Sequence, residues 1–190
     1  MLNDLSRTSV LILCFSLASV VANAQQVIHA LVGTVNVVNP YAKTIIVTID
    51  DGTKSSFDDL TDTKAHISVD KALRALTIPA VSFATKDTGA IVLFFGEGAD
   101  RVAVAMRDIG AGPFTKSSGT VVNFNGKEHT FSVKDNAGNV EVFKLTPETV
   151  AETRMGAVDS KKFEPAKGDQ VRVTSNMVNG TATALFVYAN

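Results

Sequence analysis

Histidine, the residue most often used as a general base or metal ligand near neutral pH, occurs three times, at His29, His66 and His129. The three lie far apart in the sequence, and none has a second histidine or a carboxylate at the spacing of a metal-binding motif. His129 takes the place that Lys43 occupies in an earlier, similar stretch, which indicates a solvent-facing position in a strand. Structural roles are therefore expected for all three.

Nucleophiles are equally hard to place. The chain has no G-x-S-x-G motif and no S-x-x-K with its partner motifs, and Ser117 and Ser118 only lead into a strand. The single cysteine, Cys14, lies within an apolar run near the N-terminus. We therefore expect no catalytic residue and no cofactor.

Carboxylates are the more suggestive group. Residues 50–70 hold six aspartates against two lysines, and Asp58, Asp59 and Asp62 are the candidates for a calcium ion or a cationic partner. Their spacing is not that of the D-x-D-x-D-G loop that dedicated calcium sites use. Solvated turns at the rim of a hairpin are therefore the favoured interpretation of these residues.

The N-terminus has the form of a secretory leader. Twelve uncharged residues run from Val10 to Val21 and are followed by Ala22-Asn23-Ala24. The run is shorter than the roughly 20 residues that span a bilayer. We expect cleavage after Ala24, no membrane span afterwards, and a secreted or periplasmic protein. Its mature form has no cysteine and therefore no disulfide.

The overall charge argues against nucleic acid as a partner. The chain has 18 basic and 19 acidic residues, no tryptophan and two tyrosines, whereas such proteins combine a basic surface with stacking aromatic residues. A saccharide site would lack its usual tryptophan platform. Tyr41, in the turn Asn39-Pro40-Tyr41, is the one aromatic residue expected to be exposed as a ligand contact.

The main pattern in the chain is an internal repeat. Residues from Gly33 onward match those from Gly119 onward at nine of 31 positions, with an offset of 86 and no gap. The shared pattern is G-T-V, then Asn, then T-x-x-V, then a turn that ends in glycine, then Phe and Thr. Two copies of about 80 residues indicate a duplicated module rather than a solenoid.

Each copy has the alternation of β-strands. Ile45, Val47 and Ile49 share one face, Phe131 and Val133 take the matching places, and Gly52, Gly138 and Asn179-Gly180 mark hairpin turns. After the third strand, Ser68–Leu76 predicts a short helix, and Thr146-Pro147-Glu148 predicts another at the corresponding place.

Three strands, a short helix and two strands form the element order of an OB-type barrel. The predicted fold is therefore mainly β, with two tandem small OB-like β-barrels, each with a helix between its third and fourth strands. The expected organisation is a leader at residues 1–24, a first barrel at 25–109, a linker at 110–116 and a second barrel at 117–190.

The repeated motifs, together with the K-G-D-x-V-x-V stretch from Lys167, resemble those of exported bacterial proteins built of OB-like barrel repeats and classified as a domain of unknown function. The resemblance covers most of residues 31–189, although the first copy reads Lys86-Asp87-Thr88-Gly89 in place of the second copy's Lys167-Gly168-Asp169. It implies a location in the envelope or outside the cell. It implies no activity and no functional residues.

The strand Ala90–Phe95 (AIVLFF) is apolar on both faces. One face must be covered from outside its own barrel, because a bare apolar patch invites aggregation. We expect that cover to be the other barrel or, by self-association through this strand, a second copy of the chain. Val92 and Phe94 are the candidates for an interface or an apolar ligand groove.

These features favour a non-enzymatic exported protein that acts as a binding or scaffolding module of the cell envelope, with an unknown envelope protein as one partner. Two alternatives stay open: a carrier of an apolar or saccharide ligand, and a hydrolase with a site between the barrels. Histidine and carboxylates converging in a cleft would favour the hydrolase.

Overall fold

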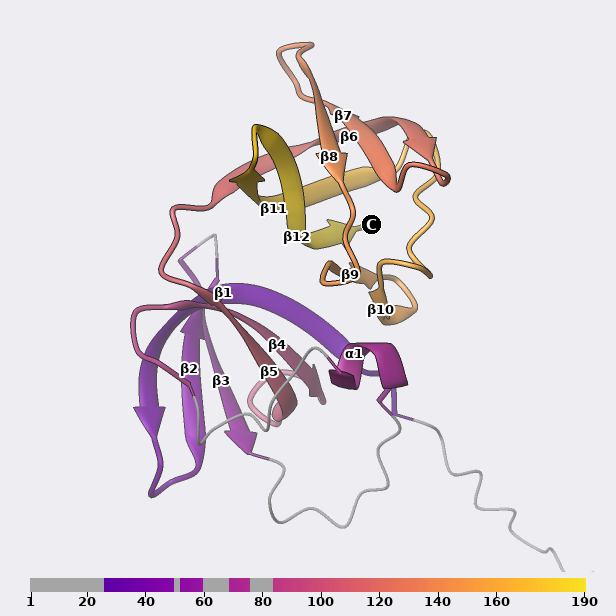
Figure 1. Ribbon diagram of the computed structural model, residues 1–190. Coiled ribbons are helices and arrows are strands. Elements are labelled where there is room, and N and C mark those ends of the chain that lie inside the picture. The colour runs from indigo at the N-terminus through magenta and orange to yellow at the C-terminus, as the bar shows by residue number, and fades with distance from the viewer. Residues whose placement is uncertain (1–25, 50–51, 60–68, 76–83) are drawn as a thin grey trace, which may run out of the picture.

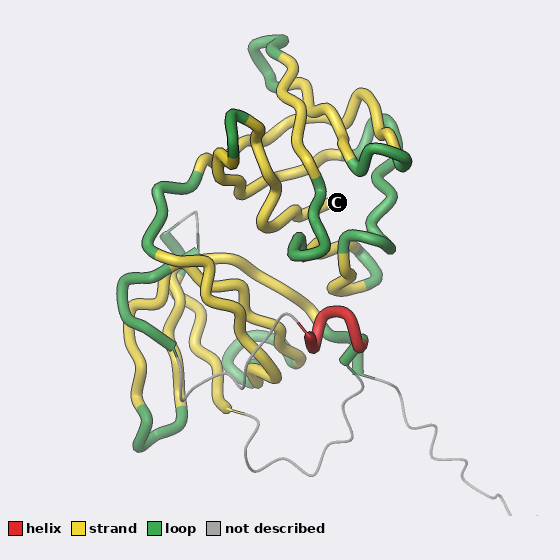
Figure 2. The backbone as a smooth tube through the Cα atoms, in the orientation of Figure 1, coloured by secondary structure: helices red, strands yellow, loops and turns green. Residues whose placement is uncertain are grey.

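β-Strands form most of the computed structural model, which describes residues 26–49, 52–59, 69–75 and 84–190 (Figures 1 and 2). The expected leader, residues 1–24, lies outside these ranges. The strands form two sheets, one in each half of the chain. We refer to residues 26–110 as the first half and to residues 115–190 as the second half.

In the first half, five strands form a closed barrel in the order β1-β2-β3-β5-β4. The strands are β1 (His29–Asn39), β2 (Thr44–Thr48), β3 (Lys54–Asp59), β4 (Gly89–Phe95) and β5 (Val102–Gly110). Every neighbouring pair is antiparallel except β3 and β5, which are parallel. Ile45 and Val47 alternate along β2 and are both buried, as their spacing predicts.

The second half is a seven-stranded sheet in the order β10-β9-β12-β11-β6-β7-β8. The strands are β6 (Thr115–Asn125), β7 (Thr130–Lys134), β8 (Val140–Lys144), β9 (Val150–Thr153), β10 (Gly156–Asp159), β11 (Gln170–Val178) and β12 (Thr181–Ala189). A parallel contact between β12 and β8, at Thr183 and Lys144, joins the sheet across its far side. Strands β6, β7, β8, β11 and β12 therefore pair with one another as β1 to β5 do.

Residues that are 86 positions apart occupy matching places in the two sheets. A Cβ atom on Gly33 would lie 2.4 Å from the Thr48 carbonyl oxygen, and one on Gly119 would lie 2.1 Å from that of Lys134. Real Cβ atoms do not approach so closely, so only glycine fits where the adjacent strand crosses. A β-bulge follows that glycine in both β1 and β6.

The turns after these two strands match as well. The side-chain oxygen of Asn39 accepts two backbone N–H groups in its turn, and that of Asn125 does the same. Lys43 and His129 each end the turn with a positive φ, at 51° and 50°. His129 is exposed, as expected, but it lies in the turn before β7 and not in a strand, which corrects the prediction from sequence.

Each sheet encloses an apolar core. The first core is made of Val35, Ile45, Val47, Phe57, Ala90, Val92, Phe94, Ala103 and Met106. The second is made of Val121, Phe131, Val133, Phe143, Leu145, Ala151, Phe163, Val171, Val173, Ala184 and Val187. Phe57 and Phe143, again 86 positions apart, are both fully buried.

A third apolar cluster, the seam, joins the two halves. It is made of Ile28, Ala30, Leu73, Ile91, Leu93, Phe95, Ala105, Val150 and Phe186. All seven residues of β4 are buried, because one face of the strand lies in the first core and the other in the seam. The cover of this strand therefore lies within the same chain, and it combines Val150 and Phe186 of the second half with first-half residues such as Leu73.

This arrangement corrects two predictions about which residues of this strand form an interface. Val92 and Phe94 belong to the first core, and it is Ile91, Leu93 and Phe95 that meet the other half. Self-association through Ala90–Phe95 is also wrong, because the strand presents no exposed residue to a second copy. Alternation identifies two faces, but barrel closure decides which of them points inward.

A short helix follows the third strand in the first half only. It is α1 (Lys71–Ala75), which begins after Asp70, whose carboxylate accepts the Ala72 N–H at 2.7 Å, and which buries Leu73 in the seam (Figure 2). No helix in the described ranges has the length and apolar character needed to cross a membrane.

At the corresponding place in the second half the predicted helix is wrong, because the chain forms the hairpin β9–β10 instead (Figure 1). Thr149 and Val150 are β-branched, which favours strand over helix. Val150 then pairs with Phe186 in a parallel contact between β9 and β12. Thr146-Pro147-Glu148 is consequently a turn, closed by a hydrogen bond from Thr149 N–H to the Thr146 carbonyl at 2.9 Å.

Candidate functional site

A cavity of about 620 Å³ lies between the two halves. The first half contributes residues of β1 and the turn after β4, and the second half contributes residues of β6, β9, β11 and β12. Its volume is within the range of small-molecule sites, and both apolar and charged side chains line it. Its position beside the seam makes it the candidate functional site.

His29 and Glu152 form a polar bridge across this cavity. Nδ1 of His29, on β1, lies 2.7 Å from Oε1 of Glu152, on β9, and the Ala30 N–H donates to Oε2 at 2.7 Å. The Glu152 side chain is only 9% exposed, whereas that of His29 is 40% exposed. A carboxylate of the second half is thus held by two groups of the first half, which fixes the His29 ring at the cavity wall.

Burial raises the pKa of the Glu152 carboxyl, and the hydrogen bonds from His29 and Ala30 oppose that rise only in part. The folded protein therefore keeps the proton to a higher pH than the unfolded chain does. The contribution of this group to stability is fully present below the unfolded pKa, near the usual 4.5, and is lost as the pH rises through the folded pKa.

We expect the Glu152→Gln variant to lack this pH dependence. The free energy of unfolding of the wild type should fall relative to that of the variant as the pH rises from 4.5, by no more than about 1.4 kcal/mol per pH unit. Urea titrations at pH 4 to 7, followed by circular dichroism, measure the difference, with exposed Glu164→Gln as the control. A difference that stays constant over this range would contradict the raised pKa.

Two arginines, one from each half, line the same cavity. The Arg101 guanidinium carbon lies 5.2 Å from the centre of the Phe94 ring, and Nη1 donates to the Ser55 hydroxyl at 3.0 Å. The Arg172 guanidinium carbon lies 4.6 Å from the centre of the Tyr188 ring, which faces it across β11 and β12. Aromatic stacking therefore orients both planar groups.

The site also shows what the sequence could not indicate. His29 and Glu152 are 123 positions apart, and no local motif joins them. Arg101 and Arg172 carry no sequence signal of a site either, because each belongs to an ordinary strand or turn pattern. Phe94, named as an interface or ligand candidate, lines the cavity from the edge of the first core, whereas Val92 does not.

The other predicted site residues do not meet here. Tyr41 is 98% exposed in its turn and lies apart from the cavity lining. Asp58 is exposed and Asp59 ends β3, whereas Asp62 and His66 fall outside the described residues. Within the described ranges no three metal-ligating side chains gather into a group. The proposed cation site therefore has no support from the part of it that is described.

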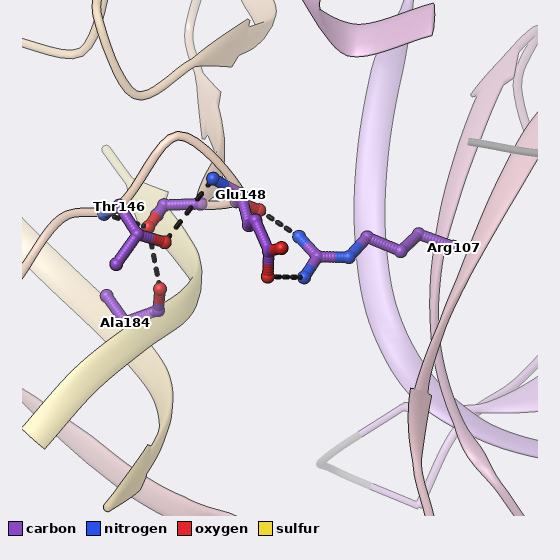
Figure 3. Close-up of polar contacts among 5 residues, drawn as sticks. Arg107, Thr146, Glu148 and Ala184 are labelled. Atoms are coloured by element: carbon purple, nitrogen blue, oxygen red, sulfur yellow. Dashed lines mark hydrogen bonds and ion pairs between the residues drawn. The ribbon is translucent and has the colours of Figure 1, made fainter. Parts of the chain in front are cut away.

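Two further ion pairs join the halves outside the cavity lining. Arg107 of β5 donates Nη2–H to the Glu148 carboxylate at 2.8 Å and also donates to the Glu148 carbonyl (Figure 3). Lys162 pairs with Asp70 at the start of α1. The hydrogen bond from Lys162 and the N–H of Ala72 hold the pKa of the Asp70 carboxyl below its usual value.

Comparison with known proteins adds no relative: a scan against protein-family models gives no match, and a search of curated proteins gives none either. By its fold and its candidate site, the chain is a two-sheet β-protein with a mixed polar and apolar cavity between its halves.

Proposed function

We propose that the protein is an exported, non-enzymatic binding module of the bacterial cell envelope, and that its ligand lies in the cavity between the halves. The observation that carries the proposal is the cavity itself. It is of small-molecule size, it is built from both halves, and its charged residues are oriented by neighbouring groups. Export rests on the leader-like N-terminus and the absence of cysteine after it.

The proposed architecture is a tandem of OB-like barrels, related to the exported proteins that the repeated motifs resemble. In its support, three antiparallel strands are followed in each half by one strand that pairs with the first and one that runs parallel to the third. The matching glycines Gly33 and Gly119 support it too. Proteins of this kind use sheet faces and loops to hold ligands.

A hydrolase between the barrels is the second candidate, because His29 and Glu152 supply the base-and-carboxylate half of a catalytic triad. A triad also needs a nucleophile that is hydrogen-bonded to the histidine ring. Among the described residues no serine is hydrogen-bonded to the His29 ring, and Ser117 in the cavity wall donates instead to Glu141 at 2.7 Å. Binding is therefore the better-supported function.

We expect native mass spectrometry of the chain, isolated from the periplasmic or secreted fraction, to show a bound small molecule. Ser118→Trp should abolish the added mass, because Ser118 is an exposed cavity-wall residue of β6 whose enlargement fills the cavity without entering the core. Ser56→Trp places the same ring on an exposed position of β3 outside the cavity lining and is the matched control.

The two variants separate the explanations. Loss of the added mass in Ser118→Trp and its retention in Ser56→Trp would support binding in the cavity. An unliganded wild type, or a ligand that Ser118→Trp retains, would overturn the proposed site.

A further inference from the structure

The cavity wall carries more basic than acidic side chains. Arg101, Lys116 and Arg172 line it, against two carboxylates, Glu97 and Glu152. Both oxygens of Glu152 are already engaged, by His29 and by the Ala30 N–H. Glu97 is exposed, in the turn after β4. Neither carboxylate forms an ion pair with Arg101 or Arg172 in the described part of the chain.

The two guanidinium groups keep unused donors. A guanidinium group carries five N–H donors. Arg101 uses one on Ser55, and its buried Nε has no hydrogen-bond partner within the described residues. Arg172 forms its contact with the Tyr188 ring and no hydrogen bond to any described residue. The N–H groups of the two guanidinium ends that no protein group uses can donate to an oxygen of a ligand in the cavity.

Apolar side chains form another part of the wall, beside polar ones such as Ser118 and Thr174. Leu31, Val32, Phe94 and Phe186 line the cavity together with the two arginines. A wholly polar ligand would lose its hydration where it touches these apolar side chains and would gain no apolar contact in return. A neutral apolar ligand would displace water from two guanidinium groups and offer them no hydrogen-bond acceptor.

We propose that the ligand of this cavity is an amphiphilic anion: an organic carboxylate or phosphate whose charged group is held by Arg101 and Arg172 and whose apolar body packs on Phe94 and Phe186. This inference rests on the proposed function and specifies its ligand. Oxyanions accept two parallel N–H bonds from one guanidinium, so the arginines fit this class better than they fit a single neutral acceptor.

Calorimetric titration with matched pairs tests the charge requirement. The probes are phenyl phosphate against phenol, decanoate against decanol, and inorganic phosphate alone. Each anion should bind at least about tenfold more tightly than its neutral partner and more tightly than inorganic phosphate, because charge-assisted hydrogen bonds and apolar contact both contribute.

Arginine variants test the residues. Arg172→Gln should weaken binding of the anions by at least about tenfold and leave the neutral probes unchanged. Arg172 is exposed, so this variant keeps the test open if Arg101→Gln, which loses a bond to buried Ser55, is unstable. Arg154→Gln removes an exposed arginine outside the cavity lining and is the charge-matched control.

The outcomes separate the two proposals. Neutral and anionic probes that bind equally, with both lost in Ser118→Trp, would overturn the anion inference and leave the cavity as the binding site. If inorganic phosphate binds as tightly as phenyl phosphate, the proposal that the ligand has an apolar body is overturned. Binding of no probe at millimolar concentration, or equal loss in Arg154→Gln and Arg172→Gln, would also overturn the inference.

Discussion

Replacement of Phe186 by alanine is expected to lower the free energy of unfolding by about 3–5 kcal/mol. Phe186 lies on β12 and is 4% exposed within the seam, where it packs among residues of the first half such as Leu93 and Ile91. The loss comprises the transfer of the ring to water and the cavity left between two sheets that are each held by their own hydrogen bonds. Urea unfolding followed by circular dichroism, which needs no tryptophan, measures it.

Because Phe186 lies in the seam, its replacement should also change the number of unfolding transitions. Because the seam is the apolar contact between the halves, its weakening should separate one cooperative transition into two. Phe124→Ala is the control, since Phe124 is a half-buried phenylalanine at the margin of the second core and touches no seam residue. A Phe186→Ala variant that unfolds in one step, within about 1 kcal/mol of the wild type, would contradict the role given to the seam.

Local features of the fold could be predicted because short-range chemistry determines them. The alternation in β2 and β7 places Ile45, Val47, Phe131 and Val133 inward without reference to the rest of the chain. Asn179-Gly180 forms the β11–β12 turn with positive φ at both residues, as that dipeptide predicts.

Features that depend on the partner of a strand could not be predicted in the same way. The residues after Thr146 carry a helix-start signal, yet the pairing of Val150 with Phe186 makes them a strand. Likewise, the apolar strand Ala90–Phe95 required a cover, but only closure of the barrel assigns Leu93 to the seam and Val92 to the core.

The candidate site escaped prediction for a further reason: it is built across the two halves. Glu152 looks like a surface residue in sequence, and only the approach of β9 to β1 buries it against His29. The packing of the two halves also brings Arg101 and Arg172 into the lining of one cavity. The repeat places one copy of the pattern in each half, and it carries no signal about how the halves pack together.

The duplicated pattern itself has a direct energetic test in Phe57 and Phe143. Both are fully buried, and each packs on a second phenylalanine of its own core, with ring centres 5.2 Å apart for Phe57 and Phe94 and 5.4 Å apart for Phe143 and Phe131. We expect Phe57→Ala and Phe143→Ala each to lower the free energy of unfolding by about 3–5 kcal/mol, measured in urea. A loss of that size is a large part of the stability of a typical domain.

Equal losses would mean that the two positions are energetically equivalent, as the offset of 86 predicts. The matched control is Val142→Ala, an exposed neighbour of Phe143 on β8, which should change the free energy of unfolding by no more than about 0.5 kcal/mol. A small loss in one phenylalanine variant beside a large one in the other would contradict the equivalence. It would mean that the two copies share a backbone pattern, whereas the contribution of the matching phenylalanine to stability differs between their cores.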